Sequence, residues 1–284
     1  MTDRMRHPVT LKRVVYDVPG TAEVEVRRGC RYWPDDADEH ALDFYYPPGH
    51  RDDAAPLPAV VFVSGLPDPG ALKVLGCRVN EMESFVSWGR LVAAHGLIGV
   101  TYTTGDDPAA DVTRVLDFLS AEGVGHGVDA SRLGLWACSS HVPTALSALM
   151  RGRPAIRCAV LCYGFMLDLD GATGVAGAAR VWRFANPGMG RSAADLPPET
   201  SLFIVRAGRD TIAGVNESID RFVPAALAAD LPLTLVNLPA APHAFDLDDD
   251  CAATRSEVEQ ILDFLRAHVP GVLPSTGEVR PPGQ

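Results

Sequence analysis

Six short apolar segments recur along the chain, with helix-like stretches between them. They are apolar on both alternating faces, which is typical of strands buried inside a parallel sheet. These segments are residues 59–63, 98–102, 133–136, 158–162, 202–205 and 231–236. In the last of them, Pro232 is tolerated only at the start of the strand or on an edge strand. Two earlier strand-like stretches, residues 23–32 and 40–46, have no helix between them. We therefore expect a mainly parallel sheet with an antiparallel edge.

The intervening stretches carry apolar residues at helical spacing. Residues 112, 115, 116 and 119 follow an i, i+3, i+4, i+7 pattern, and similar patterns occur within residues 85–92, 219–227 and 258–265. Thr254 and Glu257 have the spacing of a capping box and predict the start of the last helix. Alternating strands and helices predict an α/β fold with helices on both faces of the sheet.

The chain of 284 residues contains no internal repeat and no linker between two cores. We therefore predict one domain over residues 1–284. The exception to the regular alternation is residues 165–200, which are rich in Gly, Ala and Pro. Insertions of this length are often functional, and we predict a lid over the site. Residues 271–284 are expected to form a loose tail.

Composition excludes several classes of protein. Hydrophobic residues make up 47% of the chain and charged residues 21%, as in globular proteins. A net charge of −11 gives no general attraction to nucleic acid or anionic lipid. Neither a secretory signal nor a membrane-length apolar run is visible. The six cysteines form no CxxC pair, so we expect reduced thiols in a cytoplasmic protein.

The most informative segment runs from residue 132 to residue 150, where a predicted strand leads directly into a predicted helix. Ser139 lies on the turn between them, in the nucleophile position of a G-x-S-x-G elbow. Ala137 and His141 replace the two glycines of that motif. The elbow alone is therefore a weak signal, because a serine in such a turn can also cap the helix.

Two downstream residues strengthen the case. Asp210 follows the strand at residues 202–205, and His243 follows the last strand. A serine nucleophile needs a base to accept its proton and a carboxylate to orient that base. Ser139, Asp210 and His243 are predicted at the same edge of the sheet, in the chain order of the α/β-hydrolase triad.

These residues make the chain resemble α/β-hydrolases of the dienelactone hydrolase-like or small acyl-esterase kind, over roughly residues 22–268. The resemblance implies an α/β-hydrolase fold and a small-molecule ester substrate. It also implies an oxyanion hole formed by the backbone N–H groups of Leu66 and Ser140. Ser64 stands where such proteins often have a histidine, which backbone donors tolerate.

Alternatives remain within the elbow and around it. Cys138 or Ser140 would be the nucleophile if the turn were shifted by one residue. One interpretation of His141 is that it binds substrate or tunes the nucleophile. The other is that it fills space beneath the lid or hydrogen-bonds a neighbouring loop. Phe165 and Trp182, in the predicted lid, are candidate substrate-binding residues.

The sequence predicts neither a metal nor a cofactor. It shows no dinucleotide-binding glycine motif and no zinc-like spacing of His and Cys. The run containing Asp246, Asp248 and Asp250 imitates a calcium loop but has Cys251 where that loop needs glycine.

The predicted activity is hydrolysis of a carboxylic ester, lactone or thioester through an acyl-enzyme. The alternative is a protein of the same fold with a non-hydrolytic binding or biosynthetic accessory role, because fold alone does not fix function. Exposed edge strands permit a homodimer without requiring one.

Overall fold

An eight-stranded sheet forms the centre of the computed structural model, which describes residues 6–34, 40–153 and 155–269. The strands are β1 (Glu25–Arg31), β2 (Ala41–Tyr46), β3 (Leu57–Phe62), β4 (Ile98–Tyr102), β5 (Val128–Cys138), β6 (Ile156–Cys162), β7 (Ser201–Ala207) and β8 (Leu233–Leu238). Their order is β1-β2-β4-β3-β5-β6-β7-β8. Strand β2 pairs antiparallel with β1 and with β4, and the other neighbours are parallel. The sheet matches the predicted architecture, including its antiparallel edge.

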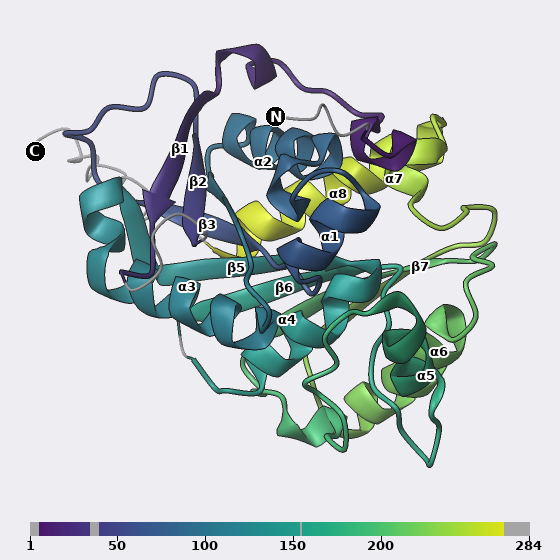
Figure 1. Cartoon of the computed structure of the whole chain (residues 1–284). Coiled ribbons are helices and arrows are strands. Elements are labelled where there is room, and N and C mark those ends of the chain that lie inside the picture. The colour runs from purple at the N-terminus through teal and green to yellow at the C-terminus, as the bar shows by residue number, and fades with distance from the viewer. Residues whose placement is uncertain (1–5, 35–39, 154, 270–284) are drawn as a thin grey trace, which may run out of the picture.

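Helices cover both faces of this sheet (Figure 1). They are α1 (Asp68–Val74), α2 (Glu83–Ala94), α3 (Pro108–Glu122), α4 (Val142–Leu149), α5 (Gly174–Trp182), α6 (Val215–Ala228), α7 (Phe245–Asp248) and α8 (Ala252–His268). Helices α2 and α8 contribute to one buried cluster, and α3, α4 and α6 to another on the opposite face. Within the described residues, no helix is both long and apolar enough to cross a membrane.

Two local predictions fail for identifiable reasons. Strand β8 is not buried on both faces, because it is the edge strand beside β7, and Pro232 directly precedes it. Helix α8 begins at Ala252 with Cys251 as its N-cap, which makes no side-chain capping bond. The predicted capping box at Thr254 and Glu257 is therefore wrong. Both side chains are buried on the face of α8 that packs on the protein.

The insertion at residues 165–200 contains its own short helix, α5. The Asp168 carboxylate accepts hydrogen bonds from the Val175 and Ala176 N–H groups in the first turn of that helix, at 2.9 and 2.8 Å. At the base of the insertion, the ring of Phe165 stacks on Phe184 with a centroid separation of 5.1 Å. The predicted tail, residues 271–284, lies outside the described residues.

Candidate active site

Three of the parallel strands, β5, β7 and β8, end at the same edge of the sheet, with β6 between the first two, and each is followed by one predicted site residue. Ser139 follows β5, Asp210 follows β7, and His243 follows β8. Gly208 allows the last two segments to approach closely, since a Cβ there would lie 2.7 Å from the Pro239 backbone. The topology therefore brings together residues that are far apart in sequence.

Ser139 occupies a strained turn between β5 and α4. Its φ is 51°, in the left-handed region that non-glycine residues rarely adopt. Such a conformation costs on the order of 1–3 kcal/mol and persists only where the surrounding structure enforces it. A short 3₁₀ turn, Ser139–His141, then leads directly into α4. A nucleophile elbow requires a strained strand-to-helix turn of this kind.

The three side chains form a continuous hydrogen-bonded chain. Ser139 Oγ lies 2.9 Å from His243 Nε2, and His243 Nδ1 lies 2.6 Å from Asp210 Oδ2. The Asp210 side chain is completely buried, whereas His243 remains 21% exposed. The other Asp210 oxygen accepts a hydrogen bond from the Ile212 N–H at 2.9 Å. The carboxylate is thus fixed on both oxygens and holds the imidazole towards the serine.

The glycines that the elbow lacks are found on the segments that face it. A Cβ on Gly65 would lie 2.7 Å from the Ser140 carbonyl oxygen, and one on Gly164 would lie 2.1 Å from Val142 Cγ2. Close approach to the elbow is therefore provided by its neighbours. This explains how the turn accommodates the side chain of His141.

The buried Asp246 carboxylate is linked to His243 through Tyr163. The His243 ring packs edge-on against Tyr163, with centroids 4.9 Å apart. The Tyr163 hydroxyl donates to Asp246 Oδ1 at 2.6 Å, and Trp88 Nε1 donates to Asp246 Oδ2 at 2.7 Å. Burial raises the pKa of Asp246 above its ordinary value. Sequence reasoning missed this support because Asp246 begins a run of acidic residues with the spacing of surface ligands.

The loop after β3 contains one backbone amide that has no acceptor among the described residues. The Ser64 N–H donates to the Tyr102 hydroxyl at 3.1 Å, and the Gly65 N–H donates to His141 Nδ1 at 2.8 Å. For the Leu66 N–H, the described residues provide no acceptor. Leu66 and Ser140 both line the pocket that contains Ser139. The two residues whose amides are predicted to form an oxyanion hole thus line the same pocket as the serine.

That pocket has a volume of about 550 Å³ and is mainly apolar. Phe165 and Trp182 line it, as do Val74 and Val181 at its exposed rim. His141 is not among the lining residues and is buried behind the elbow. Of the three candidate substrate-binding residues, the two aromatic ones face the pocket.

The alternative nucleophiles are placed differently from Ser139. The pKa of the Cys138 thiol is raised by burial and by the nearby Asp246 carboxyl, so the thiolate is disfavoured. Ser140 lines the pocket, but the imidazole of His243 is hydrogen-bonded to Ser139. The one-residue shift that would favour either neighbour is not seen in the strand pairing, which places Cys138 at the end of β5.

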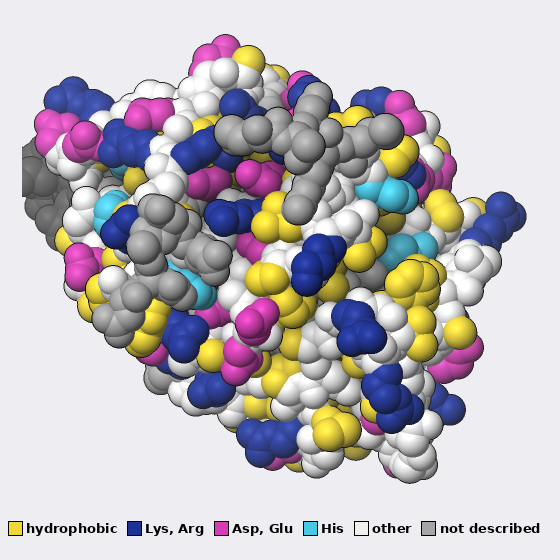
Figure 2. Space-filling view, in the orientation of Figure 1, with side chains coloured by type: hydrophobic (Ala, Val, Ile, Leu, Met, Phe, Trp, Pro, Cys, Tyr) yellow, Lys and Arg dark blue, Asp and Glu magenta, His cyan; other side chains and the backbone are white. Residues whose placement is uncertain are grey.

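Acidic and basic side chains are interspersed on the face shown in Figure 2. Within the described ranges, no group of three or more His, Cys, Asp or Glu residues is arranged to hold a metal ion. All six cysteines lie in these ranges and are free thiols.

The sequence was compared with protein-family models and with curated proteins. No protein-family model matches the sequence. No curated protein matches it either.

Solved structures match over most of the chain. A thermostable esterase from Pseudomonas putida superposes with a TM-score of 0.65 at 17% identity, covering 90% of this chain and 86% of the esterase. A vibralactone cyclase gives 0.68 at 15% identity, covering 90% and 83%. An esterase from Thermogutta terrifontis gives 0.60 at 17% identity, covering 89% and 98%. Together with the sheet order, these matches show that the chain has the α/β-hydrolase fold.

Proposed function

We propose that this protein is a serine hydrolase that cleaves carboxylic esters. The observation that carries the proposal is the hydrogen-bonded chain from Ser139 through His243 to Asp210, on a strained turn at the edge of the sheet. The esterases among the structural neighbours favour the same activity. The arrangement meets the geometric criteria for nucleophile, base and orienting acid.

In the proposed reaction, Ser139 Oγ attacks the ester carbonyl carbon while His243 Nε2 accepts the hydroxyl proton. Asp210 accepts the hydrogen bond from Nδ1–H and stabilises the imidazolium. The Leu66 and Ser140 N–H groups bind the developing oxyanion. The tetrahedral intermediate then collapses, and the alcohol leaves with the proton from His243. Water, deprotonated by His243, attacks the acyl-enzyme and releases the acid.

The pocket suggests the kind of ester. Its volume of about 550 Å³ lies within the usual range for small-molecule sites. Apolar side chains such as Phe165 and Trp182 favour an apolar acyl or alcohol group. The resemblance to dienelactone hydrolases makes lactones part of the same proposal, and thioesters undergo the same acyl transfer.

The test is active-site labelling combined with turnover. A fluorophosphonate should add its mass at Ser139, and short-chain p-nitrophenyl esters should be hydrolysed. Ser139→Ala should abolish both. An unlabelled folded protein, together with full esterase activity of the alanine variant, would contradict the proposal. Ligand binding without turnover across esters, lactones and thioesters would favour the non-hydrolytic alternative.

A further inference from the structure

His141 makes a contact that the triad does not explain. Its Nδ1 accepts the Gly65 N–H at 2.8 Å, and its ring packs edge-on against Phe85 with centroids 5.4 Å apart. An imidazole nitrogen that accepts a hydrogen bond carries no proton, so the neutral ring holds its proton on Nε2. Burial favours this neutral form and lowers the pKa of His141 to about 4.

The contact fixes the peptide group next to the one that supplies the Leu66 N–H. Gly65 lies directly against the elbow, with its ideal Cβ position 3.0 Å from His141 Cα. The Gly65 carbonyl belongs to the same planar peptide group as the Leu66 N–H, and it accepts the Ala185 N–H at 2.8 Å. Both peptide groups that flank the Gly65 Cα are therefore held, one by His141 and the other by Ala185.

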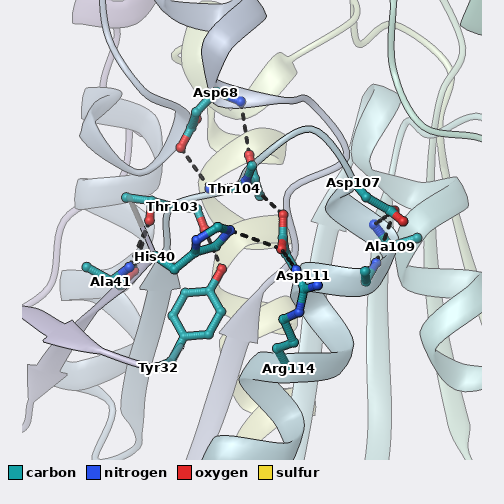
Figure 3. A network of polar contacts seen from close by, with 12 residues as sticks. Tyr32, His40, Ala41, Asp68, Thr103, Thr104, Asp107, Ala109, Asp111 and Arg114 are labelled. Atoms are coloured by element: carbon teal, nitrogen blue, oxygen red, sulfur yellow. Dashed lines mark hydrogen bonds and ion pairs between the residues drawn. The ribbon is translucent and has the colours of Figure 1, made fainter. Parts of the chain in front are cut away.

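The far side of Leu66 is held as well. Thr104 Oγ1 donates to the Leu66 carbonyl at 2.7 Å. Thr104 is itself fixed by Asp68, whose carboxylate accepts the Thr104 N–H at 2.8 Å (Figure 3). The same carboxylate accepts the Val79 N–H at 3.0 Å. Leu66 is thus clamped from both directions while its own N–H keeps no acceptor among the described residues.

We propose that His141 is a positioning residue for the oxyanion hole, acting through Gly65 to aim the Leu66 N–H at the carbonyl oxygen of a substrate on Ser139. This inference rests on the proposed function. In this role His141 contributes to stabilisation of the transition state by orienting the Leu66 N–H, and it does not touch the substrate. What matters at this position is an unprotonated acceptor at the place of Nδ1.

Two substitutions separate the acceptor from the bulk of the ring. His141→Asn keeps an acceptor, Oδ1, near the place of Nδ1, while His141→Phe keeps a ring beside Phe85 and removes the acceptor. The comparison uses the full chain with a p-nitrophenyl ester, after circular dichroism has shown that each variant is folded. We expect H141F to lower kcat at least ~10-fold with little change in KM, because the hole is misaligned but not removed. H141N should recover most of that loss.

Two results would overturn the inference. One is an H141F variant with wild-type kcat, and the other is an H141N variant that loses as much kcat as H141F. A wild-type protein that neither hydrolyses esters nor reacts at Ser139 would instead contradict the proposed function, and the inference with it. The two failures are therefore distinguishable.

Nuclear magnetic resonance supplies a readout that needs neither turnover nor a stable phenylalanine variant. In the wild-type protein at pH 7, the ¹⁵N shifts of His141 should show a protonated Nε2 and an unprotonated Nδ1. The Gly65 amide should be protected from hydrogen exchange. A proton on Nδ1, or an unprotected Gly65 amide, would contradict the inference.

Discussion

Gly65 and Ser140 are in such close contact that a Cβ on the glycine would lie 2.7 Å from the Ser140 carbonyl oxygen. A backbone oxygen cannot rotate away as a flexible side chain can, so any larger residue must displace the loop or the elbow. The spacing between the two proposed oxyanion donors, the amides of Leu66 and Ser140, therefore depends on position 65 being glycine, whose side chain is a single hydrogen atom.

Replacing that hydrogen with a methyl group should disturb this spacing. We expect Gly65→Ala to lower kcat by at least ~10-fold, because loss of one oxyanion donor typically costs 10²–10³-fold and displacement costs part of that. Steady-state kinetics on a p-nitrophenyl ester measure the effect. Gly177→Ala is the matched control, since a Cβ there meets nothing within 4 Å and α5 favours alanine. Equal activities of the two variants would contradict the prediction.

Removing the charge of Asp210 tests the proposed triad without changing its shape. We expect Asp210→Asn to lower kcat by about 10³–10⁴-fold, because an amide no longer holds the His243 tautomer that can accept the serine proton. The control is Asp220→Asn on α6, where the carboxylate is exposed and pairs with Arg206. A D210N variant as active as D220N would exclude the assigned role.

The two neighbours of Ser139 should be dispensable as side chains. Cys138→Ala should keep activity within a few-fold of the wild type, since burial disfavours the thiolate. Ser140→Ala should do the same, because the proposed contribution of this residue is its backbone N–H. Mass spectrometry after fluorophosphonate treatment should still find the label at position 139 in both variants. A label that disappears in either variant would reassign the nucleophile.

Glu257 should make the protein less stable as pH rises. Its side chain is buried, Oε1 has no hydrogen-bond partner among the residues that the structure describes, and burial raises its pKa from 4.5 to about 7. The folded state keeps the proton between pH 4.5 and 7 while the unfolded state has lost it, so stability falls across this window. By linkage, Glu257→Gln should gain up to about 3 kcal/mol relative to the wild type between pH 4.5 and pH 8.

Urea unfolding of the wild type and the E257Q variant at both pH values measures this difference. The control is Glu259→Gln, one of the exposed positions of the same helix. A difference in unfolding free energy that is the same at pH 4.5 and pH 8 would contradict the raised pKa of Glu257.

His141 should give the opposite pH dependence. Its pKa falls from 6.5 to about 4 on folding, so the unfolded state binds more protons between these values and stability is lost as pH falls. Full stability from this group is present above pH 6.5. His141→Asn should flatten the acid side of the stability profile by about 3 kcal/mol over this window. Identical profiles for both proteins between pH 6.5 and 4 would show that the histidine does not stay neutral.

Strand pattern and chain order were enough to predict the sheet. Strand β4 coincides with the predicted segment at residues 98–102, because consecutive apolar residues bounded by polar ones leave little freedom in register. The expectation of a strand buried on both faces failed at β8, which is an edge strand. The sequence signal for this was Pro232, because proline is tolerated only at the start of a strand or on an edge strand. Edge or centre is decided by the rest of the sheet.

In the candidate site, too, some features could be predicted from the sequence and others could not. Ser139, Asp210 and His243 could be proposed because each follows a recognisable strand. The supporting contacts of Asp246 with Tyr163 and Trp88 could not, since they join residues that are distant in sequence and ordinary in type. The role of Gly65 beside His141 depends on packing distances, which no spacing within the chain encodes.

The hydrogen bond from the Ala185 N–H to the Gly65 carbonyl links the insertion at residues 165–200 to the loop after β3. An outward swing of this insertion would break that bond and release the peptide group that carries the Leu66 N–H. Under the proposed function, admission of substrate by such a swing would therefore disturb the proposed oxyanion hole until the insertion returned. Trp182 lines the pocket and is exposed, and entry of substrate beside it would leave the Ala185–Gly65 hydrogen bond intact. Turnover would then not require the insertion to move.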